Sequence, residues 1–237
     1  FASGFEEEKD GLDFSIRLEK AAGELPFIGP NCYGFVNFFD SVALWPDQVP
    51  RELLNRGVAF IAQSGTIAIT VMGQRRSLPL GYVITIGNQQ RLAAEDIIRF
   101  TAADERVTAI GLYLEQINDL SKFIEAVDFA RSMGKPIALI KAGRTEKGRL
   151  VAQTHTGAMT GSDTFYDNLF ERLGIARCEN LSSLVETLKI LHFFGPLKSN
   201  KVLLLGASGG DMAMASDLSK DYDFHLNQNP NQFIAII

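Results

Sequence analysis

Cysteine and histidine are scarce in this sequence, which has 237 residues but only two cysteines and three histidines. Cys32 and Cys178 are too few to build a disulfide scaffold or a metal site. We therefore expect a protein of the reducing cytoplasm. His155 has no cysteine or second histidine nearby at metal-ligand spacing, so the sequence predicts no metal site.

An excess of basic charge and long apolar runs are also missing. The formal net charge is −5, and the lysines and arginines are scattered along the chain, which argues against nucleic acid as a partner. No apolar run approaches the roughly twenty residues of a membrane-spanning helix, and the sequence shows no charged and then apolar leader. The chain opens on Phe1 and closes on an apolar stretch at 233–237, so we expect a fragment of a longer protein.

Strand and helix patterns alternate from Gly57 onward. Continuous apolar runs of this kind are typical of strands buried on both faces of a parallel sheet. We expect strands at 57–62, 82–86, 107–114, 136–141 and 175–178, with helices near 66–76, 92–102, 119–133, 162–173 and 181–194. The alternation predicts an α/β fold, in which a doubly wound parallel sheet is covered by helices on both faces.

The two ends of the chain show weaker patterns. Before the alternating region we expect a helix within 6–24, a short strand at 27–28 and an irregular linker at 36–55, where two prolines discourage regular structure. After Gly195 the pattern restarts with a strand at 201–205, a glycine-rich turn and a helix at 211–218. This restart predicts a second α/β unit.

Three groups of polar residues follow predicted strands, where open parallel sheets bind their ligands. These groups are 63–66, Gly87-Asn88 and Glu115. Ser64-Gly65-Thr66 opens a helix directly after a buried strand, so its amides would either hold a phosphate or form an ordinary helix cap. Glu115 would either accept a hydrogen bond from an imidazole or be an exposed loop acid.

A polar loop at 141–163 carries His155 near its middle, among small residues. Loops of this length without an apolar period are more often functional than idle. The residues leave open whether His155 is a nucleophile, an acid/base, an anion contact or a loop histidine without a chemical role. The turn at 29–34 and the glycines at 206–210 would likewise either face a ligand or only turn the chain.

Together, these features resemble one family, the ADP-forming acyl-CoA synthetases of the acetate–CoA ligase type, within the succinyl-CoA synthetase superfamily. The resemblance covers almost the whole chain, and the combination of motifs is specific although each motif alone is not. The matching stretches are GPNCYG at 29–34, AFIAQSGT at 59–66, TIGN at 85–88, LYLE at 112–115, KAGRTEKG at 141–148 and THTGAMTGSD at 154–163.

The resemblance implies roles for individual residues. His155 would take a phosphoryl group from an acyl phosphate and carry it to a nucleotide-binding domain, and Glu115 would orient its imidazole. Phosphate-binding residues would be Ser64, Gly65, Thr66 and Gly157, and the residues contacting coenzyme A or the acyl substrate would be Gly29, Pro30, Asn31, Cys32 and Asn88. At 89–92 this chain has Gln-Gln-Arg-Leu where the family usually has a Lys-Ala-Asp type of run, so no role is carried over to those positions.

The resemblance also implies a domain plan. Residues 1–55 would be the end of a coenzyme A-binding Rossmann domain plus a linker, 56–196 a flavodoxin-like, succinyl-CoA synthetase-like domain with the phosphohistidine loop, and 197–237 the start of a second flavodoxin-like domain. The two flavodoxin-like domains would have a three-layer αβα arrangement. The ATP-grasp domain that holds ATP or ADP with magnesium is not in this sequence, and the fragment alone is not expected to complete the reaction.

The implied function is reversible acid–thiol ligation, in which acyl-CoA, ADP and phosphate give a carboxylic acid, coenzyme A and ATP. The implied partners are the small-molecule substrates and an ATP-grasp domain or subunit, and we expect an oligomer. One alternative is a regulatory module without turnover, fused to a protein acetyltransferase, although the presence of both His155 and Glu115 argues against it. A coenzyme A-transferring lyase or a carbamoyl-transferring relative is another.

Overall fold

The computed structural model describes residues 5, 11–50, 53–148, 162–203, 206, 208–221 and 225–226. The chain separates into two units, Phe1–Gly195 and Pro196–Ile237. The first unit contains the sheet that positions the candidate site.

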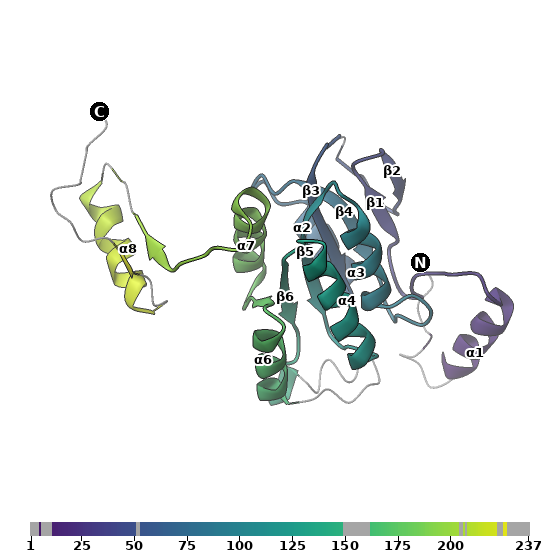
Figure 1. Cartoon of the computed structure of the whole chain (residues 1–237). Helices are drawn as coiled ribbons and strands as arrows, with labels where there is room; N and C mark the ends of the chain where they lie inside the picture. The colour runs from purple at the N-terminus through teal and green to yellow at the C-terminus, as the bar shows by residue number, and fades with distance from the viewer. Residues whose placement is uncertain are drawn as a thin grey trace. The chain divides into compact units, whose positions relative to one another are not determined.

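A seven-stranded mixed sheet forms the centre of the first unit, in the order β2-β1-β4-β3-β5-β6-β7 (Figure 1). The five strands from β4 to β7 in this order pair in parallel, as the apolar runs predict. They are β3 (Gly57–Ala62), β4 (Leu80–Thr85), β5 (Val107–Leu114), β6 (Ile137–Lys141) and β7 (Ala176–Arg177). Every residue of β3, β4 and β6 is buried, because helices cover both faces.

Helices cover the sheet in two layers, so the predicted three-layer α/β arrangement is confirmed (Figure 1). One layer is α3 (Ala94–Ala103), α4 (Leu120–Ser132) and α6 (Asp163–Arg172), and the other is α2 (Gly65–Met72) and α7 (Leu181–Phe194). Successive strand residues point to opposite faces. Ile61 therefore packs with the α3, α4 and α6 layer, whereas Phe60 packs with α2 and α7. Full burial of one such side chain contributes about 1.5–3 kcal/mol.

The expected linker at 36–55 is wrong in its first part. Strands β1 (Phe35–Asn37) and β2 (Val42–Leu44) form an antiparallel pair, and β1 also pairs antiparallel with β4. The sheet is therefore mixed, and only its main body is parallel. These strands are three residues long and β2 is exposed, so they lack the continuous apolar run that identified the others.

The short strand expected at 27–28 is also wrong, because the structure has no strand at these positions. Instead, backbone hydrogen bonds tie this segment to the loop after β4. Leu92 N donates to Phe27 O (3.2 Å), Gln90 N to Gly29 O (3.0 Å) and Asn88 N to Pro30 O (3.0 Å). These bonds hold the turn at 29–34 next to Gly87-Asn88.

The remaining elements match the expected pattern more loosely. Helix α1 (Gly11–Ala22) lies within the range 6–24. In the second unit, β8 (Lys201–Val202) and β9 (His225–Leu226) pair in parallel and α8 (Gly209–Asp221) lies between them in sequence. None of the helices in the described ranges combines the length and the apolar character needed to cross a membrane.

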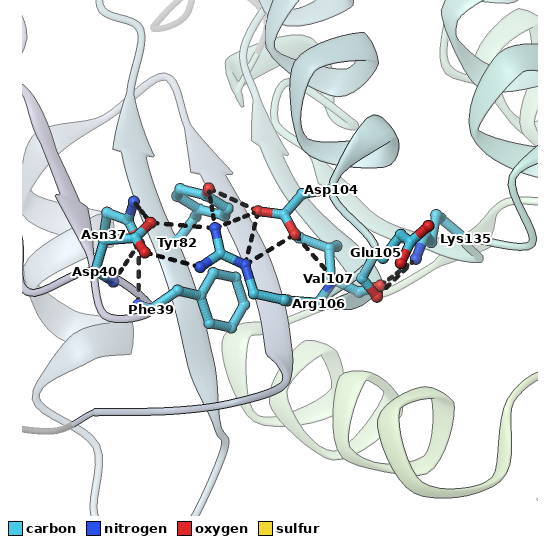
Figure 2. Close-up of polar contacts among 9 residues, drawn as sticks. All are labelled: Asn37, Phe39, Asp40, Tyr82, Asp104, Glu105, Arg106, Val107 and Lys135. Carbon is cyan, nitrogen blue, oxygen red and sulfur yellow. Dashed lines mark hydrogen bonds and ion pairs between the residues drawn. The ribbon is translucent and has the colours of Figure 1, made fainter.

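Ionic contacts close the amino edge of the sheet, as Figure 2 shows. Arg106, in the turn before β5, donates to the carboxylates of Asp104 (2.8 Å) and Asp40 (2.9 Å). Its guanidinium lies 4.6 Å from the ring centroid of Phe39. Arg106 lowers the pKa of Asp104 to about 2, and Tyr82 Oη donates to the same carboxylate (2.8 Å). These contacts lie at the edge of the sheet opposite the candidate site.

Candidate functional site

A cavity of about 190 Å³ opens at the carboxyl edge of the parallel strands. It lies where β3, β4 and β5 end, and β3 stands between the other two in the sheet. The chain order reverses at this point, which is where open α/β sheets bind their ligands. The cavity is lined by Asn31, Tyr33, Gln63, Ser64, Gly65, Thr66, Gly87, Asn88 and Glu115.

The amino terminus of α2 forms one wall of the cavity. Ser64 is the N-cap, and its side chain accepts a hydrogen bond from Ile67 N (3.4 Å). The other amides of the first turn have no partner within the helix and carry a partial positive charge. An anion at this wall would therefore meet backbone donors, with the exposed Thr66 beside them.

Tyr33 also lines the cavity, and its ring packs closely against the first residue of α2. A Cβ atom on Gly65 would lie 2.9 Å from Tyr33 Cγ, so a larger residue at position 65 would push the ring away. The ring packs edge-on against Trp45, with centroids 5.8 Å apart. The backbone amides of Tyr33 and Gly34 both donate to Thr85 Oγ1 at 2.9 Å, which fixes the turn to the end of β4.

Gly87 allows the turn and the β4 loop to come together. Its φ is +53°, and a Cβ atom would lie 2.2 Å from the carbonyl oxygen of Pro30. Only glycine fits this approach. Next to it, Asn88 Nδ2 is buried and has no hydrogen-bond partner in the described part of the chain. Asn88 lines the cavity, so a ligand oxygen that reaches this amide would give it a partner.

Most of the residues predicted from the sequence meet at this cavity. Asn31, Ser64, Gly65, Thr66, Asn88 and Glu115 all line it. The other members of the predicted turn lie beside it. The carbonyl oxygens of Gly29 and Pro30 accept hydrogen bonds from the loop after β4. Cys32 is half-buried, and burial raises the pKa of its thiol. His155 and Gly157 lie outside the described residues.

Tyr33 and Lys141 were given no role from the sequence, and Gln63 was predicted only as a member of the polar group at 63–66. Tyr33 and Gln63 belonged to recognised motifs, and their contacts become visible only in the fold. Lys141, the last residue of β6, has only 2% of its surface exposed, and burial lowers its pKa to about 8, helped by Arg177. The sequence signal that could have identified Lys141 is a lysine at the end of an otherwise apolar strand. The described residues contain no cluster of three or more His, Cys, Asp or Glu suited to a metal.

Several proteins of related sequence are ADP-forming ligases. The chain is 30% identical to the alpha subunit of acetate–CoA ligase (ADP-forming) I from Pyrococcus furiosus, a match that covers 96% of this chain and 50% of the relative. It is also 30% identical to the acetate–CoA ligase (ADP-forming) of Methanocaldococcus jannaschii, over 84% of this chain and 28% of the relative. The chain thus spans half or less of the length of these relatives.

A solved structure and a family model agree with this. The acetyl-coenzyme A synthetase 1 of Candidatus Korarchaeum cryptofilum, in complex with phosphate and ADP, matches with a TM-score of 0.82 and 27% identity. The match covers 97% of this chain and 50% of that chain. The model of the succinyl-CoA ligase like flavodoxin domain matches residues 55–191, more than half of the sequence. The chain belongs to the family of the succinyl-CoA ligase like flavodoxin domain.

Proposed function

We propose that this chain is the phosphohistidine-bearing part of an ADP-forming acyl-CoA synthetase. The observation that carries the proposal is the cavity at the ends of β3, β4 and β5, where the α2 amides, the buried Asn88 amide and Glu115 line one space. Such a space has backbone donors for a phosphoryl group and a carboxylate that can orient an imidazole. The ADP-forming relatives give the reaction class.

The proposed reaction proceeds in three transfers. A phosphate oxygen attacks the thioester carbon, the carbon–sulfur bond breaks, and acyl phosphate and coenzyme A are formed. A ring nitrogen of His155 then attacks the phosphorus, and the bond to the acyl oxygen breaks to release the carboxylic acid as its carboxylate. Finally a terminal oxygen of ADP takes the phosphoryl group, giving ATP and free His155. The α2 amides would stabilise charge on the transferring group, and Glu115 would hold the imidazole in line.

The chain would supply only part of the machinery. Coenzyme A would contact the turn at 29–34 beside Asn88, which is the orphaned donor at the cavity. The resemblance to the ADP-forming synthetases implies that an ATP-grasp domain or subunit would hold the nucleotide and its metal. The described residues contain no cluster of three or more His, Cys, Asp or Glu that could hold a metal ion. Because the relatives are at least about twice as long, the proposal concerns the complete enzyme.

The proposal is tested by ATP formation. We expect the complete enzyme to make ATP from ADP and phosphate when it is given a short-chain acyl-CoA with magnesium, and to make acyl-CoA in the reverse direction. A panel of acyl-CoA substrates would define the acyl group. If no acyl-CoA of the panel supports ATP formation while the protein is folded, the proposed function is wrong.

We expect inorganic phosphate to bind in the cavity against the amides of Gly65 and Thr66. The Thr66→Val variant should bind phosphate about 10-fold more weakly, because a hydrogen bond to a charged group is lost. Thr70→Val is the matched control, since Thr70 lies exposed one turn further along α2 and donates to the carbonyl of Thr66 (2.9 Å). Amide chemical shifts during a phosphate titration report both affinities. Equal affinities in the two variants, or shifts confined to other regions, would contradict the site.

A further inference from the structure

The peptide groups that follow β5 are held by two buried side chains from neighbouring strands. Gln63, directly after β3, accepts hydrogen bonds at its Oε1 from Glu115 N (2.8 Å) and Gln116 N (3.1 Å). Lys141, at the end of β6, donates from its Nζ to the carbonyl oxygen of Glu115 (2.7 Å). Only 6% of Gln63 and 2% of Lys141 is exposed. The backbone of Glu115 is therefore clamped at both its N–H and its C=O.

The donors of Lys141 are used within the protein. An ammonium group has three protons. Two go to the carbonyls of Glu115 and Ala142 (2.8 Å), and the Nζ also lies 4.7 Å from the ring centroid of Tyr166 in α6. Lys141 is not among the residues that line the cavity. These contacts fit a residue that positions Glu115 and do not fit one that contacts the substrate.

Burying a lysine at this position costs free energy of folding, so stability does not explain its presence. Burial of an ammonium group is unfavourable, and hydrogen bonds offset this cost only in part. Lys141 forms no ion pair with a carboxylate of the described residues, although the charges of Asp163 and Glu115 favour its protonated form. Its hydrogen bonds go to carbonyl oxygens. Buried ionisable groups with shifted pKa values gather at functional sites.

We infer that Lys141, together with Gln63, is a positioning residue that clamps the Glu115 peptide and so sets the carboxylate for phosphoryl transfer. The inference rests on the proposed function, in which Glu115 orients the imidazole. The strand register supports this inference. Lys141 of β6 pairs with Leu114 of β5, and its side chain reaches the next residue of the chain, Glu115. A charge-assisted bond of this kind is stronger than a neutral one, so the clamp weakens when Lys141 loses its proton.

The test uses the complete enzyme and measures the single-turnover rate of phosphoprotein formation from acyl-CoA and phosphate. We expect Lys141→Met to fold normally, to keep the KM for phosphate, and to transfer the phosphoryl group about 10²-fold more slowly, the size of effect that a small misplacement of a catalytic group produces. Lys141→Arg should recover part of this rate, because a guanidinium can donate to both carbonyls.

The matched control is Lys135→Met. Lys135 donates to the carbonyl of Val107 at the opposite end of the same strand, as Figure 2 shows, and its contacts lie at the amino edge. We expect its transfer rate to equal that of the wild type. A Lys141→Met rate within about threefold of wild type would overturn the inference, because a lost positioning contact should cost far more. If Lys141→Met does not fold, Gln63→Met takes its place, and an undiminished rate in Gln63→Met overturns the inference.

The pH profile separates positioning by a cation from simple structural support. Burial lowers the pKa of Lys141 to about 8, so the ammonium is present below that pH and is lost as the pH rises through it. The wild-type transfer rate should therefore fall above about pH 8, and in Lys141→Arg this fall should move to higher pH. An identical fall in the two proteins would overturn the inference. If the wild type forms no phosphoprotein at any pH, the proposed function has failed instead.

Discussion

We expect the His155→Ala variant of the complete enzyme to lose both net synthesis and the phosphoprotein, with the overall rate falling by about 10⁴-fold or more. Loss of an essential nucleophile has effects of this size, because the covalent intermediate can no longer form. The proposed reaction needs one side chain to receive the phosphoryl group at the cavity and deliver it to ADP. His155 is the histidine that stands among small residues in the polar loop.

His192→Asn is the matched control for this variant. His192 lies in α7 and shares a hydrogen bond of 2.7 Å with Thr108, at the start of β5 and far along the strand from Glu115. Burial lowers the pKa of His192, and the fold holds its ring against Thr108. We expect this variant to synthesise acyl-CoA at the wild-type rate. Equal activity in His155→Ala and His192→Asn, measured by coupled assay, would contradict the proposed role.

The second large effect is expected for Glu115→Gln. The amide keeps the shape of the side chain and its backbone contacts to Gln63 and Lys141. It loses the charge that stabilises an imidazole acting as nucleophile, so phosphoryl transfer should slow by about 10²-fold or more. Affinity for phosphate should change little, because the α2 amides that would bind it are unaltered.

Glu105→Gln tests whether this effect is specific. Glu105 precedes β5 as Glu115 follows it, and its exposed side chain lies at the amino edge of the sheet. We expect wild-type transfer in Glu105→Gln and slow transfer in Glu115→Gln, measured by rapid quench over a range of phosphate concentrations. A Glu115→Gln enzyme that transfers at the wild-type rate, or one that is slow only because phosphate no longer binds, would contradict the assigned role.

The parallel part of the fold was predictable because burial on both faces leaves a continuous apolar run. The runs at 57–62 and 107–114 predicted β3 and β5 to the residue. Strands β1 and β2 were missed because they are short, and because β2 is exposed and so has no apolar pattern. Strand β1 also pairs with β4, a contact distant in sequence that no local pattern encodes.

The candidate site was predictable where it depends on the ends of strands. Ser64, Asn88 and Glu115 each follow a recognisable strand, and parallel strands bring their carboxyl ends to one edge. Lys141 and Gln63 were not assigned roles, because a clamp on a backbone carbonyl and two amides leaves no spacing rule in the sequence. The clamp becomes visible only from the register of β3, β5 and β6.

The most direct test of the account is to find the residue that carries the phosphoryl group. The complete enzyme is incubated with γ-labelled ATP and magnesium, digested, and the acid-labile label is mapped to a peptide. We predict label on the peptide that contains His155, none in His155→Ala, and release of the label when carboxylic acid and coenzyme A are added. Label at normal levels in His155→Ala, or label that maps to His192 or His225, would contradict it.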